Sequence, residues 1–285
     1  MILQKEIASL SQQYGVAKTV IDKDWVLGHF LSGIYSYAAL KANLIFKGGT
    51  CLKKCWFPDY RFSEDLDFTA LSEKFIFTIK HLEYICSHVN EHAGIRTNIV
   101  SLKPMLYLNR LVGYEAIIKY WGADHPGNEA PAPVERWQTK IKIEIILYEK
   151  IVFNNITKVL YHPYSDELAL KESIPCYTIE EVLSEKLRAL IQRSYPAPRD
   201  YYDIWYLSKN VDSLNWTNIV EGFYKKIKFK EIVFTGVEQL INSKSERMVK
   251  AAWKNSLGHQ VNITVLPPFE SVISDLQMLM NKVFK

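Results

Sequence analysis

The spacing of apolar residues changes along the chain and predicts two parts with different secondary structure. Alternating or continuous apolar runs predict strands at residues 44–46, 65–69, 95–102, 111–120 and 139–148. Apolar positions three and four apart predict helices at residues 2–14, 24–41, 50–56, 73–93 and 178–193, and in several segments after residue 200. The chain is therefore predicted to have a mixed α/β first part and a mainly helical second part.

Two connecting segments interrupt this pattern. Residues 121–138, WGADHPGNEAPAPVERWQ, are rich in Pro, Gly, Ala and Asn, which predicts a mobile loop that is functional or disordered. Residues 162–167, HPYSDE, have the character of a connection, and helical spacing dominates after them. We therefore divide the chain into a first domain of residues 1–165 and a second domain of residues 166–285.

The composition is that of a globular protein with one large or two modest domains. The chain has 285 residues, of which 48% are hydrophobic and 23% are charged. The formal net charge of +4 is compatible with an anionic partner, but it does not by itself indicate nucleic-acid binding.

The cysteines and the apolar segments bear on the compartment. Cys51, Cys55, Cys86 and Cys176 are few and scattered, none forms a C-x-x-C pair, and no zinc site is predicted. Such cysteine usage is typical of a reducing compartment. The N-terminus lacks the apolar run of a signal peptide, and the most apolar stretch, residues 26–40, is too short to span a bilayer. These features predict a cytoplasmic protein without a membrane segment.

The first candidate site is a glycine turn in the stretch KGGTCLKKCWFPDYRFSEDLDFT, residues 47–69. Gly48 and Gly49 follow a predicted strand, and Thr50 stands at the start of a predicted helix. Glycines let the backbone approach an anion, and the free N–H groups of a helix N-terminus point towards it. The Thr50 hydroxyl could add a hydrogen bond to phosphate. Many strand–turn–helix corners contain two glycines, so the turn has a purely structural interpretation as well.

The second candidate is the pair Asp65 and Asp67, which point to the same face of a strand with Cα atoms about 6–7 Å apart. Leu66 and Phe68 point to the opposite face, into the core. Two carboxylates on one face repel each other unless a cation lies between them. Mg²⁺ prefers carboxylate oxygens and leaves coordination positions for phosphate. The alternative is a solvent-facing strand with two charges.

A third carboxylate is available in the strand TKIKIEIILY, residues 139–148. Its isoleucines form one face, and Lys142 and Glu144 lie on the other. If this strand pairs beside the Asp65–Asp67 strand, Glu144 completes a metal-binding triad. Lys142 could neutralise phosphate or pair with an acidic neighbour.

The helix at residues 178–193 offers a cation. Thr178 and Glu181 form a predicted capping box at its start. Lys186 and Arg193 border the apolar stripe, so Lys186 could reach into a cleft and meet a triphosphate, or it could form a surface ion pair with a glutamate. Arg188 points elsewhere and is expected to be solvated.

Taken together, these motifs resemble the nucleotidyltransferase superfamily of the polymerase-β type. More narrowly, the KGGT turn followed by RFS-x-DLDF is similar to the signature of the AbiEii/AbiGii toxin family of bacterial nucleotidyltransferases. Three further segments extend the resemblance: IDKDWVL at residues 21–27, EEVLSEKLRALIQR at 180–193 and PRDYYDIWYL at 198–207. Thr50 stands where broader superfamily members often have serine, and Glu144 stands where they often have aspartate.

The resemblance implies a nucleotidyltransferase-type α/β (α+β) fold, with a mixed sheet flanked by helices and a C-terminal helical domain that closes the nucleotide cleft. It implies Mg²⁺ (or Mn²⁺) as cofactor and a nucleoside triphosphate as substrate. The implied site residues are Asp65, Asp67 and Glu144 for the metal, Gly48, Gly49, Thr50, Ser63 and Lys186 for the nucleotide, and Asp203 in the active-site wall.

The implied function is that of a toxin from a toxin–antitoxin or phage-abortive system. Such an enzyme transfers a nucleoside monophosphate to an acceptor, here expected to be the 3′ end of a tRNA, and releases pyrophosphate. The basic, aromatic segments at residues 53–61 and 223–231 could contact RNA or form solvated faces. Two alternatives remain open: transfer to a protein hydroxyl or a small molecule, and a catalytically inactive nucleotide-binding protein. An antitoxin encoded nearby is the expected protein partner.

Overall fold

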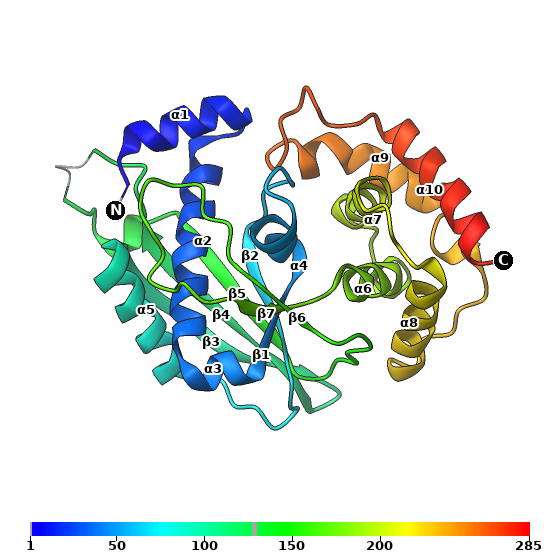
Figure 1. Cartoon of the computed structure of the whole chain (residues 1–285), viewed down its shortest axis with the longest axis horizontal. Helices are drawn as coiled ribbons and strands as arrows, with labels where there is room; N and C mark the ends of the chain where they lie inside the picture. Colours follow the sequence, from blue (N-terminus) through cyan, green and yellow to red (C-terminus); the bar gives the residue numbers. More distant parts are fainter. Residues whose placement is uncertain (1, 127–129) are drawn as a thin grey trace. The chain divides into compact units, whose positions relative to one another are not determined.

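The computed structural model describes residues 2–126 and 130–285, and the chain divides into two compact units (Figure 1). Unit 1 comprises Met1–Tyr148 and Asn155–Cys176, and unit 2 comprises Glu149–Asn154 and Tyr177–Lys285. Unit 2 therefore takes a short segment, residues 149–154, from the middle of the chain.

Unit 1 is built on a seven-stranded mixed sheet in the order β3-β4-β5-β2-β1-β7-β6. The pairs β2–β5 and β1–β7 are parallel, and the other pairs are antiparallel. The mixed sheet confirms the predicted fold class. The strands of unit 1 are β1 (Leu44–Lys47), β2 (Asp65–Ala70), β3 (Arg96–Tyr107), β4 (Arg110–Trp121), β5 (Lys140–Ile146), β6 (Ile156–Lys158) and β7 (Ile174–Cys176).

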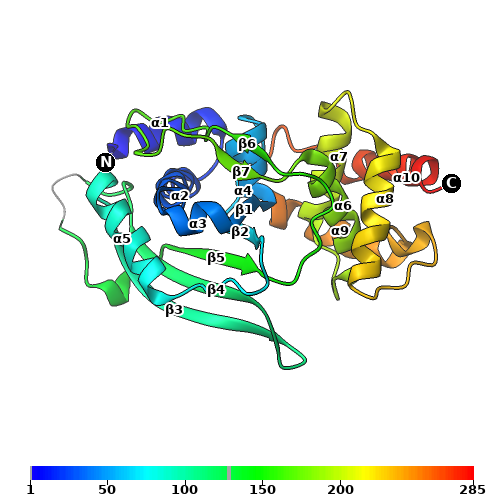
Figure 2. The same ribbon diagram turned by 60° about the horizontal axis from the view of Figure 1, so that its bottom comes forward.

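Helices cover the sheet and enclose the core of unit 1 (Figure 2). The central helix α2 is buried along most of its length and packs against α1 and α5. On the sheet side, Leu66, Phe68, Ile143 and Ile145 are almost completely buried. This burial follows from the alternation of β2 and β5, which sends every second side chain into the core. The helices of unit 1 are α1 (Gln4–Tyr14), α2 (Lys18–Ser36), α3 (Ala38–Asn43), α4 (Gly48–Cys51), the π-helix η1 (Leu52–Trp56), α5 (Ile79–Ala93) and η2 (Val134–Arg136).

In its described residues, unit 2 consists of helices and connecting segments. Helix α6 packs against α7 and α8, and α7 also packs against α9 and α10. Pro198 occupies the first turn of α7, where its missing N–H is not needed. The helices of unit 2 are α6 (Ile179–Gln192), α7 (Pro198–Asn210), α8 (Trp216–Phe229), η3 (Val237–Gln239), α9 (Ser243–Leu257) and α10 (Phe269–Val283). The predicted helical second part is confirmed.

Several predicted boundaries were wrong, for local reasons. The helix predicted to begin at residue 73 begins at Ile79, because Thr78 forms a capping box with His81 and the residues before it place Phe75 and Phe77 in the core. The strand predicted to end at residue 102 continues to Tyr107. It tolerates a proline because β3 lies at the edge of the sheet.

Two strands and one cap interaction also differ from the sequence prediction. Strands β6 and β7 were not predicted, because three residues are too few to show an alternating pattern. At the start of α6, Thr178 accepts a hydrogen bond from the Glu181 N–H, as predicted. The Glu181 carboxylate, however, accepts hydrogen bonds from the Val152 and Phe153 N–H groups, so it does not complete a capping box.

The predicted mobile loop at 121–138 is partly outside the described residues, since it includes 127–129. Its described C-terminal part is held by hydrogen bonds: Trp137 Nε1 donates to the Ala132 carbonyl at 2.7 Å, and Lys119 Nζ donates to the Val134 carbonyl at 3.3 Å. In the described ranges, no helix is both long enough and apolar enough to cross a membrane.

Candidate functional site

The glycine turn between β1 and α4 lies directly against three polar side chains. Gly48 has a φ of 81°, a left-handed conformation that favours glycine. A Cβ atom on Gly48 would collide with Oδ2 of Asp67. One on Gly49 would come within 2.8 Å of Arg61 Nη2 and 2.9 Å of Ser63 Oγ. The backbone of the turn therefore approaches the acidic strand as closely as a glycine allows.

The Thr50 hydroxyl ties this turn to the acidic strand. Its Oγ1 donates a hydrogen bond to the Asp65 carbonyl at 2.6 Å, and the residue is almost completely buried. This hydrogen bond therefore fixes the start of β2 to the turn. The backbone N–H groups at the N-terminus of α4 have no partner within the helix, as at any helix start.

The acidic strands β2 and β5 lie side by side, which confirms the pairing that the sequence analysis made conditional. They run parallel, with Asp67 opposite Glu144 and Asp65 opposite Lys142. Because Leu66 and Phe68 are fully buried on the core face, Asp65, Asp67 and Glu144 share the other face of the sheet.

Lys142 lies among these carboxylates. Its Nζ is 3.1 Å from Glu144 Oε2 and 3.8 Å from Asp65 Oδ2. Partial burial opposes the charged form of Lys142, but Glu144 and Asp65 outweigh it and raise the pKa of the ammonium. Of the two roles predicted for Lys142, pairing with acidic neighbours is the one seen in the structure.

The environment of Asp67 opposes ionisation of its carboxyl group. Burial, with repulsion from Glu144 and Asp65, raises the pKa of its carboxyl to about 6. In the described residues, two groups away from this site have three potential metal ligands whose atoms lie within 4.8 Å of one another. They are Cys51, Cys55 and Cys176, and His29, His162 and Asp166. Asp65, Asp67 and Glu144 do not form such a group, so binding one ion with all three carboxylates requires these side chains and Lys142 to move.

Two buried cations beside the turn were not assigned a role by sequence reasoning. Lys47 pairs in register with Asp67 across β1 and β2 and lowers the pKa of its carboxyl, which partly offsets the other effects. Arg61 is buried, and its guanidinium lies where a Gly49 side chain would be. Their positions inside the KGGT and RFS segments were the available signal.

The second group of predicted site residues lies in unit 2. Lys186 Nζ is 2.6 Å from Asp200 Oδ1 and 2.7 Å from Asp203 Oδ2, and both aspartates are buried. Arg193 Nε also contacts Asp200, at 3.1 Å. The alternative interpretation of Lys186, a surface ion pair with a glutamate, is wrong, because its partners are two buried aspartates of α7. Asp200 and Asp203 lie three residues apart in the first turns of α7, so both side chains are on the face of this helix that contacts Lys186 of α6.

Arg188 was expected to be solvated, and this was wrong. It is buried in unit 2, with Nη2 2.8 Å from Glu149 Oε2. The sequence could not indicate this contact, because Glu149 belongs to the short segment that joins unit 2 from the middle of the chain.

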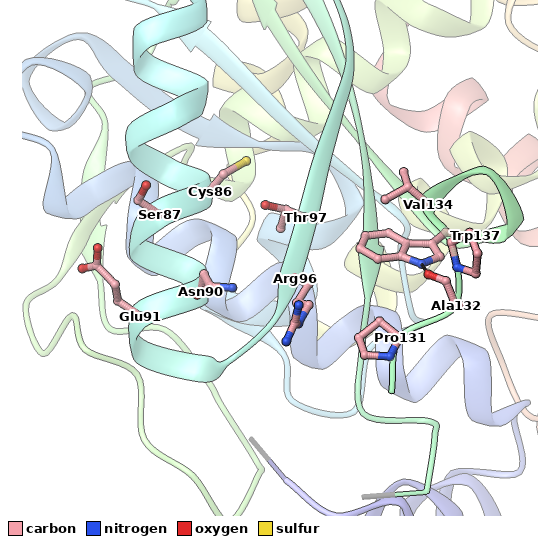
Figure 3. A pocket seen from close by; sticks show the side chains of 11 residues that line it. Cys86, Ser87, Asn90, Glu91, Arg96, Thr97, Pro131, Ala132, Val134 and Trp137 are labelled. Carbon is pink, nitrogen blue, oxygen red and sulfur yellow. Dashed lines mark hydrogen bonds between the residues drawn. The ribbon is translucent and has the colours of Figure 1, made fainter. Parts of the chain in front are cut away.

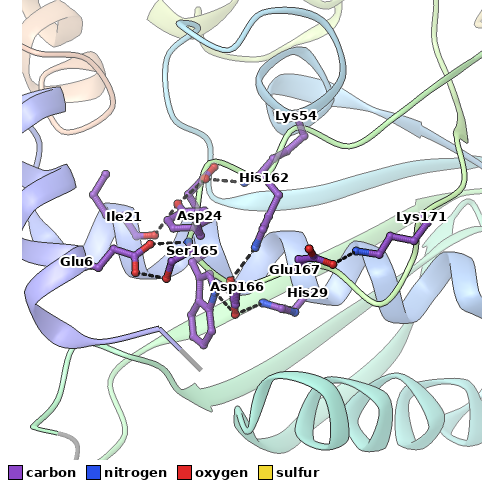
Figure 4. A network of polar contacts seen from close by, with 12 residues as sticks. Glu6, Ile21, Asp24, His29, Lys54, His162, Ser165, Asp166, Glu167 and Lys171 are labelled. Carbon is purple, nitrogen blue, oxygen red and sulfur yellow. Dashed lines mark hydrogen bonds and ion pairs between the residues drawn. The ribbon is translucent and has the colours of Figure 1, made fainter.

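The two basic, aromatic segments proposed for RNA contact contain buried lysines. Lys54 is completely buried and pairs with Asp24 at 2.5 Å (Figure 4), while Lys53 donates to the Pro58 carbonyl at 2.5 Å. In the second segment, Lys226 is completely buried and pairs with Glu181 at 2.6 Å. These three cations are internal, so neither the solvated-face interpretation nor RNA contact applies to them.

A cavity of about 590 Å³ lies elsewhere in unit 1, between α5, β3 and the segment before β5 (Figure 3). Its lining includes Asn90, Arg96, Thr97 and Trp137. None of the predicted site residues lines this cavity.

Comparison with known proteins agrees with the fold and the motifs. A family model described as nucleotidyl transferase AbiEii toxin, type IV TA system, matches residues 29–275. The chain is similar in structure to MenT4, a nucleotidyltransferase toxin from Mycobacterium tuberculosis H37Rv, with a TM-score of 0.65 and 17% identity, over 96% of this chain and 88% of that chain. It is also similar to a nucleotidyltransferase structure from H. pylori, with a TM-score of 0.55 and 15% identity, over 94% of this chain and 96% of that one. No curated protein matches in sequence.

The mixed sheet, with a glycine turn beside strand carboxylates, has the fold of these solved structures, and the family model shows that the chain is a nucleotidyltransferase. Because the family model spans most of the chain, the protein belongs to the AbiEii nucleotidyl transferase toxin family of type IV toxin–antitoxin systems. The resemblance inferred from the sequence is confirmed.

Proposed function

We propose that this nucleotidyltransferase transfers a nucleoside monophosphate from a nucleoside triphosphate to the 3′ end of a tRNA and releases pyrophosphate. The carrying observation is the placement of Asp65, Asp67 and Glu144 on one face of two paired strands, against a turn that has no room for side chains. The tRNA acceptor rests on the family resemblance. In this proposal the enzyme acts in the cytoplasm as a toxin, and a separate antitoxin restrains it.

Asp65, Asp67 and Glu144 would hold Mg²⁺ or Mn²⁺. Their hard oxygen donors suit such an ion. Burial, together with the neighbouring carboxylates, raises the pKa of Asp67, and a divalent cation would relieve this unfavourable ionisation. When bound, the ion neutralises phosphate charge and favours ionisation of the acceptor hydroxyl. Lys142 would leave its carboxylate partners as the cation enters.

The turn and the second unit supply the remaining functions of the proposed site. Backbone N–H groups of Gly49 and Thr50, with Gly48 setting the turn, would bind the β- and γ-phosphates, and Ser63 would add a hydroxyl. Lys186, held by Asp200 and Asp203, would neutralise phosphate charge. Asp203 would act by positioning Lys186. The proposed catalytic domain comprises residues 1–165, and the proposed helical domain comprises residues 166–285. Catalysis then consists mostly of positioning and charge neutralisation.

The test is a transfer assay with Mg²⁺, each labelled nucleoside triphosphate in turn, and tRNA, protein or small-molecule acceptors. Label at the tRNA 3′ end supports the proposal. Label in protein or a small molecule supports the alternative acceptors, and nucleotide binding without any transfer supports the inactive nucleotide-binding protein. Asp65→Ala should abolish the transfer, whereas Glu83→Gln, which alters an exposed glutamate of α5 in the same unit, should leave it unchanged. Transfer that survives Asp65→Ala would refute the assignment of the site.

A further inference from the structure

Three of the four cysteines meet inside unit 1, although they are scattered in the sequence. The Sγ atoms of Cys51, Cys55 and Cys176 all lie within 4.8 Å of one another, and all three are free thiols. Cys51 and Cys55 are one helical turn apart, where α4 continues into the π-helix η1. Cys176 ends β7 and pairs in register with Phe46 of β1.

We propose that Cys51, Cys55 and Cys176 form a binding site for a soft metal ion such as Zn²⁺ or Cu⁺. Thiolate ligands select these ions. With a metal–sulfur distance of about 2.3 Å, sulfurs around a tetrahedral ion are about 3.8 Å apart, so the three side chains need to move inwards by at most about 1 Å. Small rotations of cysteine side chains suffice for that.

The surroundings of the three thiols fit this role. Hydrogen bonds from Cys51 and Cys55 lower the pKa of Cys176, whereas burial raises the pKa of Cys51 and the hydrogen bond with Cys176 raises that of Cys55. One thiolate is therefore favoured, and metal binding displaces the protons of the other two thiols. Lys158 also lowers the pKa of Cys176 and would offset the negative charge of a metal bound by three thiolates. The π-helix at residues 52–56 is a rare element that is often found at functional sites.

Cys55 also provides an access path. It borders a cavity of about 300 Å³, lined by Lys53, Lys54, Trp56 and Tyr161 among others. Cys51 and Cys176 are fully buried and do not line this cavity. An ion can therefore enter at Cys55, and each thiol that binds it releases a proton to solvent.

The group of His29, His162 and Asp166 differs from the thiols, because its carboxylate already has three side-chain hydrogen-bond partners (Figure 4), although the buried Nδ1 of His162 has none among the described residues. The Asp166 carboxylate is 3.1 Å from His29 Nε2 and 2.9 Å from His162 Nε2, and it accepts a hydrogen bond from Trp25 Nε1 at 3.1 Å. This arrangement fixes the segment after β6 to α2. Outside their own group, the charged side chains of the described residues that act on these thiols are lysines, Lys54 on Cys55 and Lys158 on Cys176.

The test loads reduced, metal-free full-length protein with Zn²⁺ in one arm and Cu⁺ in the other, followed by desalting. Elemental analysis should find about one metal ion per chain, and a sulfur-to-metal charge-transfer absorption should appear in the Cu⁺ arm. The Cys176→Ser variant should retain at most about a tenth of the metal that the wild-type protein retains. The matched control is Cys86→Ser, which changes the cysteine outside the group and should behave like the wild type.

If Cys176→Ser fails to fold, a second measurement on the wild-type protein still tests the proposal. In the wild-type protein, metal should slow alkylation of Cys55 but leave that of Cys86 unchanged. Wild-type protein that retains no metal in either arm overturns the proposal. So does equal retention by a folded Cys176→Ser variant, which would assign the ion to other ligands.

Discussion

Asp67 is the residue at which the chemistry and the stability of the candidate site conflict. It faces Glu144 across β2 and β5, lies two residues from Asp65, and is in contact range of the glycine turn. These neighbours and its burial make ionisation unfavourable, as its raised pKa of about 6 indicates. A residue that opposes folding in this way fits a role in binding a cation.

The first prediction concerns Asp67→Asn in metal-free buffer. The pKa of Asp67 rises from an ordinary value of about 3.9 on folding, so its ionisation destabilises the folded state above pH ~6, and this effect is absent below pH ~4. We expect the variant to be more stable than the wild type by about 1–3 kcal/mol at pH ~8, with the difference shrinking towards pH ~4. Urea unfolding at both pH values measures it.

Asp59→Asn is the control for this experiment, since Asp59 is exposed, and it should change stability by less than about 0.5 kcal/mol. Mg²⁺ should stabilise the wild type and not Asp67→Asn. A variant that is less stable than the wild type at high pH would contradict the electrostatic argument.

The second prediction concerns Gly48→Ala. Both the left-handed φ and the collision with Asp67 oppose a side chain there, so we expect a loss of about 2–3 kcal/mol and of nucleotidyl transfer. Gly236→Ala is the matched control: Gly236 also has a positive φ, of 146°, but no atom lies within 4 Å of its added Cβ. It should cost about 1 kcal/mol and leave transfer unchanged. Equal losses for the two variants would mean that contact with Asp67 has no effect.

At the scale of elements, long periodic segments were predicted well, and contacts between distant segments were not. Strands β2 and β5 showed their two faces in the sequence, and helix α6 showed its N-cap residue Thr178 and its apolar stripe. The start of α5 was missed because a local capping box sets it, and the strands β6 and β7 were missed because three residues show no alternating pattern. The environment of Arg188 was wrong because its partner comes from residues 149–154, far away in the sequence.

The third prediction concerns the link between α6 and α7. Lys186→Gln leaves two buried aspartates without their shared ammonium, so we expect a loss of about 3–5 kcal/mol, together with weaker transfer. Lys209→Gln removes an exposed lysine of α7 that pairs with Asp275 at 3.0 Å, and it should cost less than about 1 kcal/mol. Thermal or urea unfolding of both variants gives the comparison. If Lys186→Gln were as mild as Lys209→Gln, the buried pairs would be unimportant for the helical unit.

At the scale of the whole molecule, the net charge of +4 includes lysines that are buried. Of the lysines in the two basic segments, Lys53, Lys54 and Lys226 are internal, so a net charge of +4 overstates the cations available to a polyanion in those segments. RNA contact by this protein would therefore depend on lysines and arginines at other positions or on the exposed remainder of residues 223–231.

The fourth prediction concerns salt. If tRNA is the acceptor, its affinity should fall by about tenfold to a hundredfold between about 50 and 200 mM monovalent salt, because binding releases counterions from several phosphates. Filter binding or fluorescence anisotropy with tRNA measures the slope. Asp67→Asn, which removes a carboxylate rather than an RNA-contacting cation, should show the same slope. Salt-independent binding, or none, would argue for a different acceptor.

The sequence by itself determined the class of protein, because the KGGT turn, the D-x-D strand and the helical motifs are local patterns whose residue types are dictated by their chemistry. It also determined which face of β2 and β5 carries charge, since alternation is a property of a single strand. Only the tertiary structure decided that Lys142 lies among the carboxylates, that three lysines of the two basic segments are internal, and that three distant cysteines meet. Such contacts depend on how separate segments pack, and burial, rather than residue type, sets the partners of a charged or sulfur-containing side chain.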